Sequence, residues 1–290
     1  MKNLVLRTVT GVLFVALTVF CLTYSIDTCM AFSLVVALLA NLEFCYNYDR
    51  HSLLKTMRFL NPVGTLILFM VVTSSQVFLS PGMSVAIAFI PYIILLAVMM
   101  VMVIMNYDEE DENDSIVDIS VSVFSQVYTA VPFALLVLLG VYGAQGSSWY
   151  SYTLPLSVFI FLWTNDTGAY CTGSLLHKFL PMKMAPRVSP NKTWVGTIGG
   201  VVLCLVAAYI LWKVYAYYTL PIWLGFALVV SVFGTLGDLF ESVIKRTLRI
   251  KDSGHILPGH GGILDRFDSA ILAIPATFVY FNLVDIIKTC

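Results

Sequence analysis

The sequence predicts an all-α, polytopic integral membrane protein with about nine transmembrane helices. Hydrophobic residues make up 59% of the 290 positions and charged residues only 11%, whereas water-soluble domains carry about 25% charged residues. The mean hydropathy is +0.88. Apolar runs such as Ile87 to Met105 do not alternate as a transmembrane β-strand would, and they have the length of a membrane-spanning helix. The composition therefore excludes a water-soluble protein.

Nine apolar stretches have the length that a membrane-spanning helix requires. They lie at residues 9–26, 29–46, 62–79, 84–105, 122–140, 150–171, 194–216, 219–240 and 269–287. The first follows Lys2 and Arg7, but no small-residue cleavage site follows Leu22. We therefore interpret it as an uncleaved anchor rather than as a signal peptide.

The basic residues predict how the spans are oriented. If the N-terminus lies in the cytoplasm, all of the 16 Lys and Arg residues except Lys213 and Lys288 fall on the cytoplasmic side. The positive-inside rule favours this N-in, C-out orientation. We expect a multi-pass protein integral to the cytoplasmic (inner) membrane, with its polar clusters facing the cytoplasm.

The two halves of the chain differ in character. Residues 1–149 are mostly apolar spans, which we interpret as accessory or assembly helices. Residues 150–290 carry polar residues at each predicted cytoplasmic junction, and we interpret them as a catalytic half with its site on the cytoplasmic face. In the first half, the acidic loop from Asp108 to Asp118 is interpreted as solvated, although a cation-binding patch remains an alternative.

The segment from Ser242 to Asp268 is the most polar part of the chain. It combines basic residues, carboxylates, two histidines and four glycines between strongly apolar stretches. Lys and Arg suit phosphate groups, and carboxylates suit a hard divalent cation. At a membrane edge, this combination suggests magnesium-assisted chemistry on a phosphorylated lipid.

Asp238 stands at the end of the eighth span. If that span continues as a helix, the i, i+3 and i+4 spacing places Asp238, Glu241, Ser242, Lys245 and Arg249 on one face. Ionisable groups at the rim of a helix bundle are costly to place and are candidates for function. The alternative is a carboxylate that only pairs with Lys245, and the sequence leaves both open.

Asp265 and Asp268 lie three positions apart at the start of the ninth span. Helix capping alone would explain acids in a first turn, but the glycine-rich loop at 258–262 precedes them and can bring backbone N–H groups near an anion. His255 and His260 are candidates for metal binding. We favour hydrogen bonds or phosphate contacts for them, because zinc would want a further His or Cys ligand.

Three more residues at predicted junctions are candidates. Asp166 interrupts the sixth span, where a partner from another helix, a metal or a bound nucleotide would offset the cost of its charge. Ser189 begins a segment that looks like a helix entry with capping residues. Lys192 suits a triphosphate, but an anchor to a lipid headgroup is equally compatible.

These residues fall into four motifs. The longest is Ser242-x-x-Lys245-Arg246-x-x-x-x-Lys251-Asp252-Ser253-Gly254-His255-x-x-Pro258-Gly259-His260-Gly261-Gly262-x-x-Asp265-Arg266-x-Asp268, and the others are Asn165-Asp166-x-x-Ala169-Tyr170-x-x-Gly173, Ser189-Pro190-x-Lys192-Thr193-x-x-Gly196 and Gly237-Asp238-Leu239-x-Glu241-Ser242. The set resembles the signature of the phosphatidate cytidylyltransferases (CDP-diacylglycerol synthases). The resemblance covers the second half of the chain. Val195 departs from it, since many members have a glutamate there.

The resemblance implies a reaction in which CTP and phosphatidate give CDP-diacylglycerol and pyrophosphate. The lipid phosphate would attack the α-phosphorus of CTP directly, without a covalent enzyme intermediate. It also implies Mg²⁺ on Asp238 and Asp265, compatible with a second cation such as K⁺. The implied catalytic residues are Asp238, Asp265, Lys245, Arg246 and Asp268, and the implied substrate-binding residues are Lys192, Ser189, Asp166, Arg266, His260 and Lys251.

The implied partners are CTP and phosphatidate in the bilayer. The resemblance also implies a homodimer whose site opens sideways to lipid, and we expect no nucleic-acid partner. Two other functions remain as alternatives. A CTP-dependent polyprenol or phytol kinase would use similar cations, but the long motif is that of the cytidylyltransferases. A transporter would carry ionisable groups along several spans, whereas here they cluster at one rim.

Overall fold

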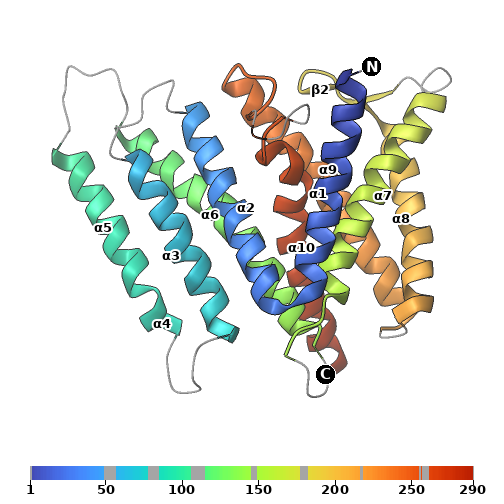
Figure 1. Ribbon diagram of the computed structural model, residues 1–290, viewed down its shortest axis with the longest axis horizontal. Coiled ribbons are helices and arrows are strands. Elements are labelled where there is room, and N and C mark those ends of the chain that lie inside the picture. The colour runs from blue at the N-terminus through green and yellow to red at the C-terminus, as the bar shows by residue number, and fades with distance from the viewer. Residues whose placement is uncertain are drawn as a thin grey trace. The chain divides into compact units, whose positions relative to one another are not determined.

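The computed structural model describes residues 2–48, 57–77, 85–105, 115–144, 149–176, 182–215, 218–254, 256 and 261–289, which are almost entirely helical (Figure 1). Six of the described helices are long and apolar enough to cross a membrane: α1 (Lys2–Tyr24), α2 (Ile26–Tyr48), α6 (Ser115–Tyr142), α8 (Trp194–Tyr215), α9 (Leu220–Thr247) and α10 (Leu264–Thr289). The all-α, multi-pass class is therefore confirmed. The count of nine spans and the N-in, C-out orientation stay predictions.

Each predicted apolar stretch falls on a helix, but the helix ends differ. The stretch 84–105 is divided by a turn at Phe89 into α4 (Val85–Ala88) and α5 (Ile90–Met105). Helix α9 continues past the predicted end at residue 240 as far as Thr247. Glu241, Ser242 and Lys245 are therefore helical, as expected if the eighth span continues as a helix.

The chain divides into two compact units. The first comprises residues 1–142 and 252–266, and the second comprises residues 143–251 and 267–290. The segment 252–266 therefore packs with the N-terminal helices although it is distant from them in sequence. The assignment of residues 1–149 to assembly and of residues 150–290 to catalysis stays a prediction.

In the first unit, α2, α6 and α3 (Met57–Val77) pack against one another around buried polar side chains. Asn41 donates to Ser125 Oγ at 3.2 Å, Gln126 donates to Asn61 Oδ1 at 3.1 Å, and Tyr92 donates to Gln126 Oε1 at 2.9 Å. A membrane interior offers no water to such groups, so they must bond to each other. The network ties α2, α3, α5 and α6 together.

In the second unit, the core is aromatic. Phe226, from α9, packs edge-on against Phe161 of α7 (Thr153–Leu176) and against Phe281 of α10, each with ring centroids 5.0 Å apart. All three rings are buried, and such edge-to-face pairs contribute about 0.5–1.5 kcal/mol beyond burial. This core holds together three of the helices that carry the candidate site.

Helices α7 and α8 approach each other closely through glycine. A Cβ on Gly168 would lie 2.9 Å from Gly200 Cα, and one on Gly196 would lie 2.9 Å from the Ala169 carbonyl oxygen. Small residues allow such contact between membrane helices. The polar residues of α7 are thereby brought next to the N-terminal part of α8.

A short β-hairpin joins α7 to α8, and the sequence did not predict it. Strand β1 (Lys183–Ala185) pairs antiparallel with β2 (Ser189–Thr193), with Ala185 opposite Ser189. Thr193 Oγ1 then accepts the N–H of Gly196 at 3.1 Å and caps α8. The expected helix entry is therefore present, but Thr193 is its cap and Ser189 is a strand residue.

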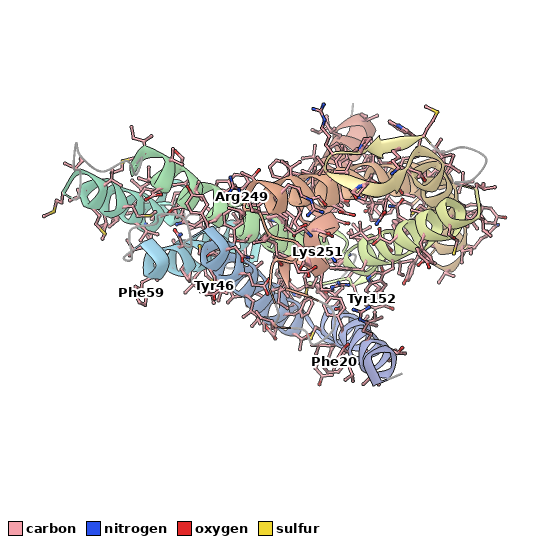
Figure 2. All side chains as sticks on the ribbon, turned by 90° about the horizontal axis from the view of Figure 1, so that it is seen from above. Phe20, Tyr46, Phe59, Tyr152, Arg249 and Lys251 are labelled. Atoms are coloured by element: carbon pink, nitrogen blue, oxygen red, sulfur yellow. The ribbon has the colours of Figure 1, made fainter. Side chains whose placement is uncertain are left out.

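Large apolar side chains cover the outside of several helices. Phe20 on α1 is 54% exposed and Phe59 on α3 is 74% exposed (Figure 2). Exposed apolar surface on this scale would be an aggregation hazard in water. It agrees with helices that face lipid.

Candidate active site

The second unit contains a cavity of about 600 Å³ that is lined by residues of α7, both strands, α8, α9 and α10. Its walls include Asn165, Asp166, Tyr170, Lys183, Lys192, Asp238 and Ser269. Cavities of roughly 300–1,000 Å³ hold small-molecule ligands. The lining carries both cations and carboxylates, which suits a phosphate-bearing ligand together with a divalent cation.

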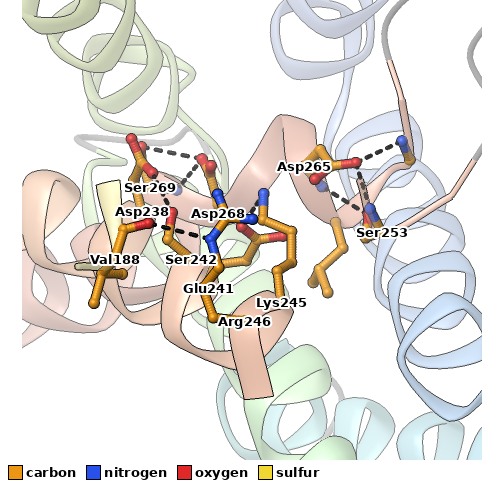
Figure 3. A network of polar contacts seen from close by, with 12 residues as sticks. Val188, Asp238, Glu241, Ser242, Lys245, Arg246, Ser253, Asp265, Asp268 and Ser269 are labelled. Atoms are coloured by element: carbon orange, nitrogen blue, oxygen red, sulfur yellow. Dashed lines mark hydrogen bonds and ion pairs between the residues drawn. The ribbon is translucent and has the colours of Figure 1, made fainter. Parts of the chain in front are cut away.

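Lys192 and Asp238 meet at this cavity. Lys192 Nζ, from β2, lies 2.5 Å from Asp238 Oδ2, and the two side chains are 24% and 29% exposed. Asp238 Oδ1 also accepts a hydrogen bond from Ser242 Oγ, one helical turn further along α9, at 3.5 Å (Figure 3). The hairpin thus brings a cation to the carboxylate from outside the helix.

Lys245 has a different partner from the one considered above. Its Nζ lies 2.5 Å from Glu241 Oε2, an i, i+4 pair in which the Glu241 side chain is fully buried. Among the described residues, Asp238 forms an ion pair with Lys192, and Lys245 forms one with Glu241. A pairing of Asp238 with Lys245 stays a prediction.

Arg249 does not continue the charged face of α9. The helix ends at Thr247, and Arg249 adopts a left-handed backbone conformation with φ 55°. The N–H of Ile250 donates to the Lys245 carbonyl at 2.9 Å and that of Arg249 donates to the Arg246 carbonyl at 3.1 Å. This is a Schellman motif with arginine in the position that glycine usually takes. The prediction that placed Arg249 on the helix face is wrong for this reason.

Other predicted cations lie at the surface of their own units. Arg246 is exposed, and its Nε donates to the Val188 carbonyl at 3.4 Å, which ties the hairpin to α9 (Figure 3). Lys251 and Arg266 are also exposed. Asp166 is exposed at the cavity wall.

Asp268 adds a carboxylate to the second unit's charged residues. Its Oδ1 accepts the Ser269 N–H at 2.5 Å and the Ser269 hydroxyl at 3.1 Å. Its strongest electrostatic neighbours are Asp238 and Glu241, with Asp166 contributing less, and all of these act against its negative charge. A cation at this position would relieve the repulsion between these carboxylates.

Asp265 belongs to the first unit, where backbone groups fix its orientation. Its Oδ2 accepts the N–H of Ser253 and the N–H of Gly262, each at 2.8 Å, and its own N–H donates to Ser253 Oγ at 3.2 Å (Figure 3). Gly261 precedes it with φ 83°, a conformation that favours glycine. Asp265 therefore links Ser253 and Gly262 to the first turn of α10.

Glu43 is the residue that sequence reasoning missed. It lies on α2, is 6% exposed, and accepts the N–H groups of Ile263 and Leu264, each at 2.9 Å. No local pattern predicts this contact, because its partners lie 220 and 221 residues further along the chain. The sequence feature that indicates Glu43 is an acid inside an otherwise apolar span.

Some predicted features lie outside the described residues. They are His255, His260, the loop residues 257–260 and the acidic residues 108–114. Asp118, the last residue of the predicted acidic loop, is described and lies buried in the first turn of α6.

The donor chemistry of the site fits Mg²⁺ better than zinc. In the described ranges, no group of three or more His, Cys, Asp or Glu side chains could hold a metal ion by protein ligands alone. Mg²⁺ usually takes only one or two protein carboxylates and completes its shell with water and substrate phosphates. The carboxylate of Asp238, at the cavity wall, is compatible with that role.

Fold and site together define a multi-pass membrane protein with a charged cavity suited to a phosphorylated ligand. Residues 5–284 match the model of the cytidylyltransferase family. The chain belongs to this family.

Individual relatives carry more specific names. The chain is 47% identical over 136 residues to a phosphatidate cytidylyltransferase of Bacillus subtilis (strain 168), covering 46% of this chain and 48% of the relative. Proteins of the same name from Staphylococcus haemolyticus and Staphylococcus aureus (strain COL) are 47% and 46% identical over 122 residues, covering 41% of this chain and 45% of each relative. The chain thus spans about half the length of the curated relatives it matches.

Proposed function

We propose that the protein transfers the cytidylyl group of CTP to phosphatidate, forming CDP-diacylglycerol and releasing pyrophosphate. The observation that carries the proposal is the cavity with Lys192 and Asp238 at its wall, in a membrane protein of the cytidylyltransferase family. The name of its relatives supports the choice of phosphatidate as the acceptor.

In the proposed reaction, an oxygen of the lipid phosphate bonds to the α-phosphorus of CTP while the bond to the β-phosphate oxygen breaks. Nothing else is consumed, and pyrophosphate leaves with the electron pair of that bond. Lys192 and Lys183 line the cavity and would neutralise phosphate oxygens. Preorganised cations of this kind stabilise the negative charge that develops during phosphoryl and nucleotidyl transfer.

We propose Asp238 and Asp265 as ligands of Mg²⁺, with Asp268 completing or orienting the site. When bound, the ion would orient the triphosphate and offset its charge. The position of Asp238 at the cavity wall supports this role. The role of Asp265 rests on the resemblance of the motif that contains it. The resemblance is the basis for proposing a second cation such as K⁺ at this site.

We further propose that the site faces the cytoplasm of the inner membrane and that the protein acts as a homodimer. Phosphatidate keeps its acyl chains in the bilayer if it enters from the side, while CTP arrives from water. The basic residues on the predicted cytoplasmic segments support this arrangement.

The test uses the purified protein in mixed micelles with phosphatidate, Mg²⁺ and CTP labelled in the α-phosphate. We expect label to move into the organic phase, to require Mg²⁺, and to be lost in Asp265→Asn while the variant still folds. Near-normal transfer by that variant would remove Asp265 from the site. Transfer from γ-labelled CTP to a polyprenol, with no α-label in lipid, would assign the protein as a kinase instead.

A further inference from the structure

Glu43 is a buried acid in the first unit, and nothing in the proposed chemistry uses it directly. It stands on α2 and is 6% exposed. In the part of the chain that the structure describes, no basic side chain forms an ion pair with it. A carboxylate placed so deeply needs other partners to offset the loss of hydration.

Among the described residues, the hydrogen-bond donors to Glu43 are Ile263, Leu264 and Ser253. Oε1 accepts the N–H of Ile263 at 2.9 Å, and Oε2 accepts both the N–H of Leu264 at 2.9 Å and the Ser253 hydroxyl at 3.3 Å. The first two donors are among the N–H groups at the start of α10 that no helical carbonyl can satisfy. A carboxylate is also favoured there by the helix dipole.

The surrounding backbone is shaped to admit this carboxylate. A Cβ on Gly254 would lie 2.4 Å from Glu43 Oε1, and a Cβ on Gly262 would lie 2.5 Å from Glu43 Oε2. Neither position could therefore carry a side chain without displacing Glu43. The two glycines and Ser253 form a pocket for one acid, and α2 supplies it.

A hydrogen-bonded path leads from Glu43 to Asp265. Ser253 Oγ donates to Glu43 and accepts the Asp265 N–H at 3.2 Å, while the Ser253 N–H donates to Asp265 Oδ2 at 2.8 Å. Asn47, one turn further along α2, donates to the Ser253 carbonyl. The Asp265 carboxylate is thus bonded to the backbone N–H groups of Ser253 and Gly262, and Ser253 is in turn bonded to Glu43 and Asn47.

We propose that Glu43 is a positioning residue for the transfer reaction: it holds Ser253 and the start of α10 at Ile263 and Leu264, so that Asp265 presents its carboxylate in the orientation needed for Mg²⁺ and substrate. The role of Asp265 in catalysis rests on the proposed function. The hydrogen bonds that link Glu43 to Asp265 through Ser253 are independent of the proposed function.

The test compares Glu43→Gln with Asn41→Ala. Glutamine has the shape of glutamate but turns an NH₂ group toward a backbone N–H donor, because both carboxylate oxygens accept backbone N–H groups. Asn41 is buried on the same helix and bonds to Ser125, away from the segment 252–266. The control therefore disturbs α2 without touching the pocket.

Two measurements separate a positioning role from a merely structural one. In the transfer assay, we expect Glu43→Gln to lower kcat by about 10–100-fold and to raise the Mg²⁺ concentration for half-maximal rate, as the loss of a residue behind a metal ligand does. The KM for CTP should change by less than about threefold, because Glu43 does not line the cavity. Asn41→Ala should lower thermal stability with a normal Mg²⁺ dependence.

Hydrogen exchange of the peptide spanning 253–266 is independent of activity. We expect faster exchange in Glu43→Gln and unchanged exchange in Asn41→Ala. Normal exchange and a normal Mg²⁺ dependence in Glu43→Gln would overturn the proposal. If the wild-type protein transferred no cytidylyl group but exchange rose in Glu43→Gln, the contacts would stand and the proposed function would fall.

Discussion

Lys192 is the residue on which the proposed use of the cavity depends most. It reaches Asp238 across the cavity wall, and neither side chain is fully buried. A partly exposed ion pair contributes little to stability, about 0–1 kcal/mol. The position of Lys192 at the cavity is therefore better explained by binding of a ligand phosphate than by a contribution to folding stability.

Lys192→Met should lower transfer by about 100-fold, because a cation that offsets charge in the transition state is lost. Its melting temperature in detergent should stay close to that of the wild type. Lys213→Met is the matched control: Lys213 stacks 4.3 Å above the Trp212 ring on α8, outside the cavity lining, and its removal should leave the rate unchanged. Equal rates for the two variants would contradict the assignment of Lys192.

Glu241 and Lys245 make a different kind of pair, because Glu241 is fully buried and Lys245 is only 16% exposed. Removing one partner of a buried pair leaves an uncompensated charge and typically costs about 3–5 kcal/mol, whereas replacing both is often neutral. Lys245→Met should therefore destabilise the protein far more than Lys192→Met does.

A double-mutant cycle on this pair checks stability and function separately. Thermal unfolding in detergent should show that Glu241→Gln combined with Lys245→Met recovers most of the stability lost in Lys245→Met alone. If Lys245 is also a catalytic residue, as the resemblance implies, the stable double variant should still be slow in transfer. A double variant with full activity would make Lys245 structural only.

At the level of helices, the contact between α7 and α8 carries half of the cavity wall. Asn165, Asp166 and Tyr170 come from α7, and Gly196 and Thr197 come from α8. The helices are close because Gly168 and Gly200 let their backbones touch. A side chain at this contact would have to push the helices apart.

Gly168→Ala should therefore lower the free energy of unfolding by about 1–3 kcal/mol, the usual cost of overpacking. Its Cβ would meet Gly200 Cα at 2.9 Å, and backbone cannot move aside as a side chain can. Gly173→Ala, in the same interface, is the control for stability, because its Cβ would find ordinary contacts at 3.5 Å and beyond. Equal melting temperatures for the two variants would show that the interface has room.

These elements also show what the sequence could and could not predict. Helical periodicity was enough to place Asp238, Glu241 and Lys245 along α9, because an α-helix repeats over any length. The hairpin at 183–193 was missed since its strands are short and contain no alternating pattern. Its consequence, the pairing of Lys192 with Asp238, is a tertiary contact that no local pattern carries.

At the level of the whole chain, the least predictable feature is that a segment from the C-terminal half belongs to the same compact unit as the N-terminal helices. The sequence separates an apolar first half from a polar second half, yet the segment 252–266 folds with the first unit. The connection depends on Glu43, whose partners are more than two hundred residues away. The residue pattern within a short stretch of sequence cannot predict a contact between residues so far apart. A single acid in an apolar span does indicate that the residue needs a polar partner.

The orientation in the membrane remains the largest untested prediction, and reporter fusions in a bacterial host can test it. With nine spans and the N-terminus inside, a fusion after Thr247 should place the reporter in the cytoplasm, and a fusion after Cys290 should place it outside, because α10 intervenes. Fluorescent protein should thus be bright only in the first, and alkaline phosphatase active only in the second. The reverse result would put Lys245 and Arg246 on the side without CTP and would overturn the proposed cytoplasmic site.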